Sequence, residues 1–201
     1  AIKHAITTMK NHFRPDYSCY HVIDYDTITG QVLKKNTHQG LAHESAWARG
    51  QAWAVYGYTA CYRETKDTTF LNFAVKVADM IMARVKTDDA IPYWDYDAPV
   101  TNETPRDASA ASVTASALIE LSTMVPDGKK YLDYAEKILK SLSSDAYLAK
   151  TGENQGFILM HSTGSLPNGS EIDTPLNYAD YYYLEALKRF MDLEGISYNS
   201  L

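Results

Sequence analysis

The chain has 201 residues, of which 45% are hydrophobic and 22% are charged, the usual composition of a globular protein. Its formal net charge of −6 argues against a nucleic-acid partner, because binding to phosphates needs clustered Lys and Arg. No apolar run approaches the roughly 18 residues of a membrane span. Cys19 and Cys61 lack the spacing of a metal site, so we expect two free thiols.

Aromatic residues with a polar group are unusually common. The chain has 16 Tyr and 3 Trp but only 5 Phe. Tyr and Trp suit half-wet surfaces, where the ring contacts an apolar face and the hydroxyl or indole nitrogen meets polar groups. Sugar rings are bound in this way, so the composition favours a carbohydrate cleft.

The first third of the chain predicts a helix, a hairpin and a second helix. Residues 1–13 place apolar side chains on one stripe, and Pro15 ends that helix. Residues 17–35 alternate and are rich in Tyr, Val, Ile and Thr, which predicts a short β-hairpin with Thr29 and Gly30 at its turn. A helix over 45–64 is apolar nearly all the way round, so we expect it to be buried on most sides.

Four further helices follow. Asp67 is expected to cap a helix over 68–86, and Asp107 a helix over 108–124 whose first residues are almost all small. An amphipathic helix is predicted over 129–144. Thr174 as cap and Pro175 in the first turn predict a last helix that runs to about residue 191. Long loops over 87–106 and 145–173 separate these elements.

The helices alternate between one-sided and buried, with buried ones starting near residues 45, 108 and 175. A ring of helical hairpins, with buried inner helices and striped outer ones, produces this pattern. We therefore predict an all-α fold: about half of an (α/α)6 six-hairpin barrel, with a small β-hairpin near 17–35. A compact six-helix bundle is the alternative. In either case residues 1–201 belong to one domain.

The segment "SAWARGQAW", residues 45–53, carries the most unusual set of side chains. Arg49 and Trp53 are four residues apart and are expected to share a helix face, as are Trp47 and Gln51. One helical turn would thus offer a guanidinium for a carboxylate, an indole for a sugar face and an amide for hydroxyls. The alternative is a buried arginine paired with a structural carboxylate, with the tryptophans in the core.

Three polar side chains are candidates to join this set. His38 and Gln39 lie in the loop that precedes the helix, and His21 lies in the predicted hairpin. Lone histidines are more often structural, so convergence with Arg49 is what would make them functional.

Acidic side chains come from two other segments. In "YWDYD", Asp95 and Asp97 point the same way if the segment is extended. In "RDASAAS", Asp107 already has a role as helix cap beside Arg106. The sequence has no metal-ligand spacing, no nucleophile elbow and no phosphate-binding glycine loop, so a hydrolase here would use carboxylates and a positioned water.

Four stretches, taken in order, resemble the unsaturated glucuronyl hydrolases of glycoside hydrolase family 88. They are "NTHQG…ESAWARGQAWAVYGYT", "IPYWDYDAP", "PRDASAAS" and "PLNYADYYYLEAL". The resemblance covers residues 1–192. The related unsaturated rhamnogalacturonyl hydrolases would be expected to carry "RGNGW" at residues 49–53, where this chain has Arg-Gly-Gln-Ala-Trp, so the glucuronyl branch is favoured.

The resemblance implies a six-hairpin α/α barrel and an unusual glycosidase. Members release the 4,5-unsaturated uronic acid that lyases leave at the non-reducing end of oligosaccharides, here of the glycosaminoglycan type. Water adds across the vinyl ether double bond, with an aspartate as general acid and base, and no cofactor or metal is implied. The partner implied is the unsaturated oligosaccharide itself, in a polysaccharide-degrading bacterium, either in the periplasm or in the cytoplasm.

The resemblance also implies roles for single residues. Arg49 would bind the sugar carboxylate and Trp53 would stack on the ring. His21 and Gln39 would contact the sugar, with Trp47 and His38 lining the cleft.

The catalytic aspartates of the family belong to an N-terminal half that precedes the matched segment. We therefore expect this chain to be the C-terminal portion of a barrel, with no catalytic residue of its own and with the N-terminal half as its partner. A non-catalytic module that binds acidic sugars is the alternative.

Overall fold

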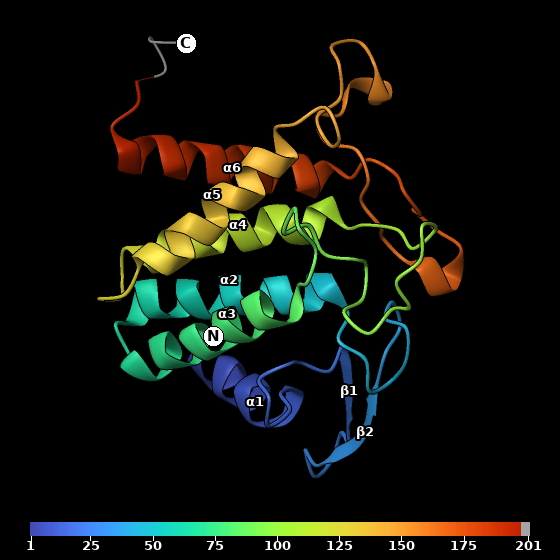
Figure 1. The fold of residues 1–201 in the computed structure, drawn as a ribbon. Helices are drawn as coiled ribbons and strands as arrows, with labels where there is room; N and C mark the ends of the chain where they lie inside the picture. The colour runs from blue at the N-terminus through green and yellow to red at the C-terminus, as the bar shows by residue number, and fades with distance from the viewer. Residues whose placement is uncertain (198–201) are drawn as a thin grey trace.

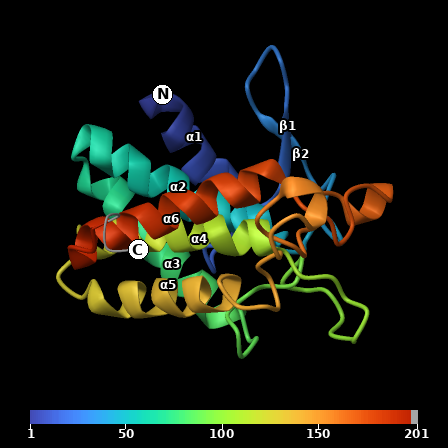
Figure 2. The ribbon, with the colours of Figure 1, turned by 90° about the horizontal axis from the view of Figure 1, so that it is seen from above.

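The computed structural model describes residues 1–197, and its helices lie in two layers (Figures 1 and 2). The inner layer consists of α2 (Ala48–Thr65), α4 (Ala108–Ser122) and α6 (Asn177–Glu194). The outer layer consists of α3 (Thr68–Arg84) and α5 (Lys129–Leu142), which pack on α2 and α4. The repeating unit is therefore an inner helix followed by an outer one, as the alternation in the sequence predicted.

Helix α4 is the centre of the inner layer and contacts α2, α5 and α6. Of its 15 residues, 13 are buried. Most are Ala, Ser or Thr, and such small side chains let neighbouring helices approach closely. Asp107 caps the helix by accepting hydrogen bonds from the amides of Ser109 and Ala110, which confirms the predicted cap.

The outer helices bury one stripe each. Helix α3 buries Phe70, Ala74, Val77 and Ile81, and α5 buries one face in the same way. Asp67 caps α3 through the amide of Thr69, as predicted. These helices begin where the sequence places them and end two residues earlier.

The other two inner helices are less buried than α4, contrary to the prediction. On α2, Trp53 is 36% exposed, and on α6, Tyr181 and Leu184 are 60% and 51% exposed. Helix α1 (Ile2–His12) has no buried residue, and Ile2 and Ile6 are about half exposed. Apolar faces of three helices are therefore uncovered in the described part of the chain.

A two-stranded antiparallel hairpin follows α1, as predicted. Strand β1 (Val22–Tyr25) pairs with β2 (Val32–Asn36). Asp26 accepts from the amides of Ile28 and Thr29 at the turn, which Gly30 completes at a φ of 71°. The hairpin and the long loops gather at the end of the molecule where the inner helices begin (Figure 1).

Two predicted helix starts are wrong. Helix α2 begins at Ala48 rather than near residue 45, because Ala46 and Ala48 form backbone hydrogen bonds with residues 94 and 96. Helix α6 begins at Asn177, and Thr174 is not its cap, because the Thr174 backbone pairs with Ser162. In both cases the residues before the helix pair with the backbone of another segment of the chain instead of forming a helical turn.

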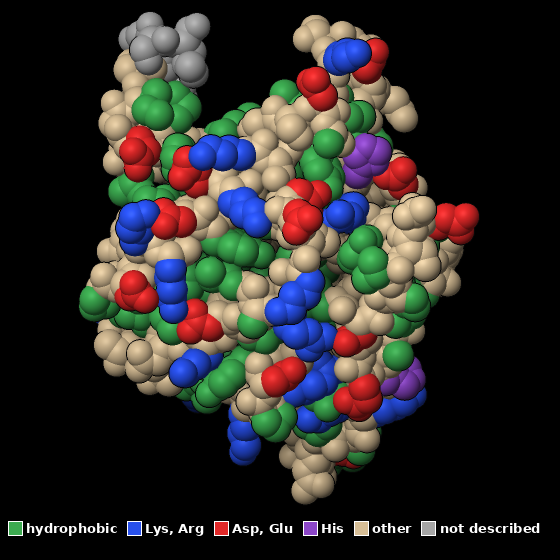
Figure 3. All heavy atoms as spheres, viewed as in Figure 1, with side chains coloured by type: hydrophobic (Ala, Val, Ile, Leu, Met, Phe, Trp, Pro, Cys, Tyr) green, Lys and Arg blue, Asp and Glu red, His purple; other side chains and the backbone are tan. Residues whose placement is uncertain are grey.

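Charges of both signs are interspersed on the face shown in Figure 3, with a short column of Lys and Arg near its middle. Lys129 and Lys130 lie on the surface and form ion pairs with Asp133 and Asp79. None of the helices in residues 1–197 has the length and hydropathy to cross a bilayer.

Candidate functional site

A hollow of about 550 Å³ lies between α1 and α2 and extends along α2 from Trp47 to Cys61. Four of the six predicted substrate-binding residues line it: His21, Gln39, Trp47 and Trp53. They come from the hairpin, the following loop and α2, so the fold brings together side chains that are up to 32 residues apart. A volume of several hundred Å³ is typical of a small-ligand site.

His21 is oriented by the backbone of the loop that follows the hairpin. Its Nδ1 accepts hydrogen bonds from the backbone amides of His38 and Gln39, each at 3.2 Å. The pKa of His21 is lowered by burial and by the neighbouring His38 and Arg49. Since Nδ1 accepts, the proton resides on Nε2, which makes His21 a hydrogen-bond donor.

Gln39 is oriented by a backbone carbonyl. Its Nε2 donates to the carbonyl oxygen of Gly164 at 2.8 Å, which leaves Oε1 as an acceptor with no partner among residues 1–197. Gly164 must be glycine, because a Cβ there would lie 2.6 Å from the Cβ of Glu171. The predicted site therefore depends on a loop more than a hundred residues further along the chain.

Arg49 is placed differently from the other predicted residues. It is 3% exposed and is absent from the lining of the hollow. Its Nη1 donates to Asp107 Oδ2 at 2.9 Å, to the Thr163 carbonyl at 2.7 Å and to Ser109 Oγ at 3.3 Å, while Nη2 donates to the Gly164 carbonyl at 2.7 Å. The pairing with a carboxylate, the alternative considered from the sequence, is thus present, and a role in binding the sugar carboxylate stays a prediction.

The side chains of Arg49 and Trp53 do not form one shared surface, although the two residues are four positions apart on α2. Trp53 lines the hollow and makes edge contacts with Tyr182 and Tyr56, with ring centroids 5.0 and 6.3 Å away. Arg49 instead lies below the hollow, 4.5 Å from the ring of Trp47 and 5.4 Å from that of Tyr178.

Trp47 connects the buried arginine to the hollow. The His21 and Trp47 rings lie 4.4 Å apart at an angle of 31°. The guanidinium of Arg49 contacts the same indole, so His21, Trp47 and Arg49 form a continuous stack from the hollow into the core. His38 is exposed and contributes its backbone to the site through its amide.

Asp107 serves both helices at once. Besides capping α4 it accepts from Arg49 and, through Oδ1, from Ser109 Oγ and the Thr163 amide. Burial raises the pKa of the Asp107 carboxyl above its usual value, while Arg49 and the hydrogen bonds oppose this shift. Both of its oxygens therefore accept hydrogen bonds, Oδ2 from Arg49 and Oδ1 from the start of α4 and from Thr163.

Asp95 and Asp97 both accept hydrogen bonds from the segment 41–46, although their stretch is not extended: residues 96 and 97 form a turn in which the Ala98 amide donates to the Asp95 carbonyl. Asp95 is 1% exposed and accepts from the Leu41 amide and from Ser45 Oγ. Asp97 is exposed and accepts from the Ala46 amide and from Arg84. Neither carboxylate lines the hollow, so the geometry gives no support to either as a substitute catalytic acid.

The sequence alone missed three contributors to the site. The carbonyls of Thr163 and Gly164 carry no side-chain signal, and their role follows only from the fold. Tyr178 lies within the matched stretch "PLNYADYYYLEAL", which is the one signal that singled it out. Cys19 and Cys61 are unpaired, and both line the hollow. Among residues 1–197 no group of three metal-binding side chains comes together.

Comparison with known proteins gives a consistent result, although no family model matches the chain. An unsaturated glucuronyl hydrolase from Formosa agariphila is 52% identical over 96% of this chain and 48% of its own length. An unsaturated chondroitin disaccharide hydrolase from Streptococcus pyogenes is 33% identical over 94% of this chain and 48% of its own.

The crystal structure of an unsaturated glucuronyl hydrolase specific for heparin matches with a TM-score of 0.95 and 62% identity, over 97% of this chain and 53% of that one. By sequence and fold, the chain corresponds to about half of an unsaturated glucuronyl hydrolase. The enzyme from Bacillus sp. GL1 matches its backbone with a TM-score of 0.87 at 30% identity.

Two consequences follow for the fold. The helical layers are those of the (α/α)6 barrel of unsaturated glucuronyl hydrolases, as the alternation predicted, and not those of a separate six-helix bundle. The chain spans about half the length of the curated relatives that it matches. It therefore corresponds to about half of such a barrel.

Proposed function

We propose that this chain forms the substrate-holding part of an unsaturated glucuronyl hydrolase that acts on lyase-generated glycosaminoglycan fragments. The observation that carries the proposal is the convergence of His21, Gln39, Trp47 and Trp53 on one hollow in a chain that corresponds to about half of such an enzyme. The relatives named above are described as glucuronyl or chondroitin disaccharide hydrolases, and one is described as specific for heparin. These names support the glucuronyl hypothesis over the rhamnogalacturonyl one.

The arrangement supplies the contacts that an unsaturated sugar needs. The Nε2–H of His21 can donate and the Oε1 of Gln39 can accept from a hydroxyl group, since their other polar atoms are engaged by the protein. The half-exposed indole of Trp53 offers an apolar surface for the ring. The guanidinium of Arg49 packs on Trp47 and supports this indole beside the hollow, while its own charge is paired with Asp107.

In the proposed reaction, water adds across the double bond between C4 and C5 of the sugar. The resulting hemiketal rearranges and expels the remaining oligosaccharide. The aspartate that protonates the double bond and activates the water belongs, in this proposal, to the other half of the barrel. Asp95 and Asp107 cannot take its place, because their oxygens are engaged in hydrogen bonds below the site.

Exposed apolar side chains on α1 and α6 support the other half of the barrel as the partner of this chain. Helix α1 exposes Ile2 and Ile6, and α6 exposes Tyr181 and Leu184. Exposed apolar side chains that gather on helix faces usually mark an interaction surface, so we propose that the remainder of the barrel covers these helices.

The test follows the ultraviolet absorbance of the conjugated double bond in the full-length protein. We expect a steady fall with unsaturated disaccharides from heparin or chondroitin, and none with those from pectin. Trp53→Ala should raise KM about tenfold or more, since loss of an aromatic contact of this kind costs about 1.5 kcal/mol. Tyr93→Ala, which removes a partly exposed ring that stacks on Arg106 away from the hollow, is the matched control.

Loss of absorbance with the pectin fragments alone would establish the rhamnogalacturonyl activity instead. No loss with any of the three, together with measurable binding of the disaccharides, would leave a sugar-binding module.

A further inference from the structure

The loop over 37–45 determines where the polar atoms of the hollow lie. It carries Gln39, and its amides at His38 and Gln39 set the tautomer of His21. Thr37 Oγ1 accepts from the Gly40 amide inside the loop. The contacts that hold this loop therefore also determine the geometry of the site.

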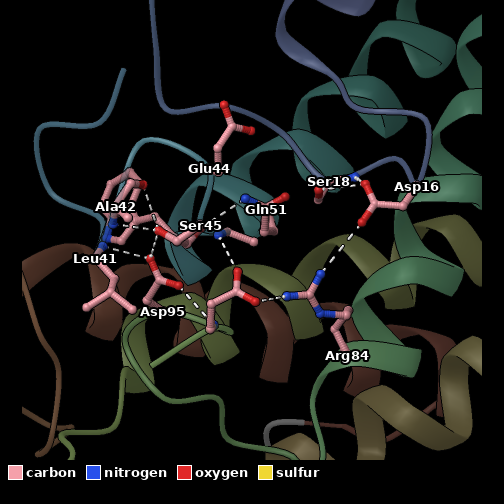
Figure 4. A network of polar contacts seen from close by, with 12 residues as sticks. Asp16, Ser18, Leu41, Ala42, Glu44, Ser45, Gln51, Arg84 and Asp95 are labelled. Carbon is pink, nitrogen blue, oxygen red and sulfur yellow. Dashed lines mark hydrogen bonds and ion pairs between the residues drawn. The ribbon is translucent and has the colours of Figure 1, made fainter. Parts of the chain in front are cut away.

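Asp95 lies directly beneath this loop (Figure 4). Its Oδ2 accepts from the Leu41 amide at 2.9 Å and from Ser45 Oγ at 2.7 Å, and its Oδ1 accepts from the Asp97 amide at 2.9 Å. The carboxylate is 1% exposed. Gly40 approaches it so closely that a Cβ at that position would lie 3.1 Å from Oδ2.

The backbone of Asp95 is fixed independently of its side chain. Residues 47 and 95 form a β-bridge, the Ala48 amide donates to the Trp94 carbonyl, and the Tyr96 amide donates to the Ala46 carbonyl. The carboxylate is thus presented from a rigid base to a loop that has little apolar packing of its own, since Leu41 and Ala42 are exposed.

We propose that Asp95 is a positioning residue of the substrate site, acting through the loop over 37–45 on Gln39 and His21. This inference rests on the function proposed above. Three donors converge on Asp95, and only a carboxylate can accept from all of them. An asparagine has a single acceptor oxygen. Whichever way its amide is turned, an N–H meets either the Asp97 amide or the Leu41 amide and the Ser45 hydroxyl, so the segment that carries residue 95 and the loop above it can no longer both be held as in the wild type.

Asp97 provides a matched control on the same segment. It also accepts from a backbone amide near the loop, that of Ala46, but it is exposed and its second oxygen meets Arg84. Ala46 lies after the loop and before α2, so its contact does not bear on Gln39. Asp97→Asn therefore changes an acid two residues away without altering the support of the loop.

The test compares Asp95→Asn and Asp97→Asn in the full-length protein by steady-state kinetics. Asp95→Asn should raise KM about tenfold or more and change kcat less than about threefold, since it displaces groups that hold the sugar. Asp97→Asn should leave both constants within about twofold of wild type. A role in stability alone would lower the amount of active enzyme, and hence the apparent kcat, with KM unchanged, and this result would overturn the proposal.

Two further measurements keep the test decisive. If Asp95→Asn does not fold, Ser45→Ala removes a single donor to Asp95, and an unchanged KM in that variant would also overturn the proposal. If wild-type protein consumes none of the disaccharides, the proposed function fails while the positioning can still be examined. The nitrogen-15 shifts of the His21 ring should then report a pure Nε2–H tautomer in wild type and a mixture in Asp95→Asn or Ser45→Ala, and identical shifts would refute the inference.

Discussion

Helices α2 and α4 are neighbours that begin at the same end of the molecule, yet their first turns are built for different tasks. Asp107 caps α4, and the residues that follow are small and buried. Trp47 stands at the corresponding position of α2, and an indole ring cannot accept hydrogen bonds from a first turn. Arg49, Gln51 and Trp53 follow within the first turns of α2, and their side chains contact other segments of the chain.

The contrast shows how one helix start can stabilise another. Asp107 contacts Arg49 as well as its own helix, so the cap of α4 also pairs the buried charge of α2. Gln51 bonds the backbone of Cys19 and so attaches the hairpin segment to α2. The side chains at the start of α2 can therefore contact the site, because Asp107 at the start of α4 supplies the counter-ion of Arg49.

Removing the shared carboxylate should have the largest effect. Asp107→Ala deletes the α4 cap and leaves the guanidinium of Arg49 buried without its counter-ion, which costs about 3–5 kcal/mol. We expect the free energy of unfolding of the full-length protein, measured in urea, to fall by this amount.

Asp67→Ala is the control for this variant. It removes the cap of α3, where the carboxylate is exposed and pairs with no arginine among residues 1–197, so the loss should be clearly smaller. Equal losses would mean that capping alone matters and that the pairing with Arg49 adds nothing.

Gln51→Ala should have an intermediate effect. Gln51 is 1% exposed, its Oε1 accepts from the Cys19 amide and its Nε2 donates to the Cys19 carbonyl. Alanine would leave the Cys19 amide buried and unpaired, while the Cys19 carbonyl would keep its bond from Arg14, at a cost of about 1–3 kcal/mol. The same urea experiment measures this loss. Gln51→Met, which keeps most of the volume but none of the hydrogen bonds, separates lost bonding from lost packing, and a wild-type value for Gln51→Ala would contradict the assigned contacts.

The smallest effect concerns pH. The pKa of His21 is lowered by burial, so the folded protein binds fewer protons there than the unfolded chain. The contribution of His21 to stability is complete above its unfolded value of 6.5 and is lost as the pH falls through its lower value in the folded state. Unfolding in urea at several pH values below neutrality measures it.

His21→Asn provides the comparison, because an asparagine oxygen can still accept near the position of Nδ1 but does not titrate. The decline in stability toward acid should be shallower in this variant. Equal slopes in the two proteins would assign the pH dependence to other groups.

The helical layers could be predicted from sequence because local patterns determine them. The stripe of α3 and the caps Asp67 and Asp107 depend on residues within a few positions of each other. The failures all involve remote partners. Thr174 has the chemistry of a cap, but its backbone pairs with Ser162 instead. The exposure of Tyr181 follows from what surrounds α6, which its own sequence does not encode.

The site could be predicted only in part for the same reason. The motif and the resemblance predicted His21, Gln39, Trp47 and Trp53, and these converge on one hollow. The partner of Arg49 lies 58 residues away, and two of its acceptors are backbone carbonyls more than a hundred residues away. The sequence left the two roles of Arg49 open because nothing near residue 49 distinguishes them.

The carbonyl of Gly164 accepts from both Arg49 and Gln39, and it lies in a hairpin that is closed at two levels. Ser162 pairs with Thr174, and Ser165 pairs with Ser170 further out. The exposed tip over 167–169 lies beyond both pairings and reaches back to the loop over 37–45, where Asn168 Nδ2 donates to the His38 carbonyl. The hairpin therefore acts on the hollow at two points, through the Gly164 carbonyl near its base and through Asn168 at its tip, and a shorter loop grafted at the tip would remove one of these two supports.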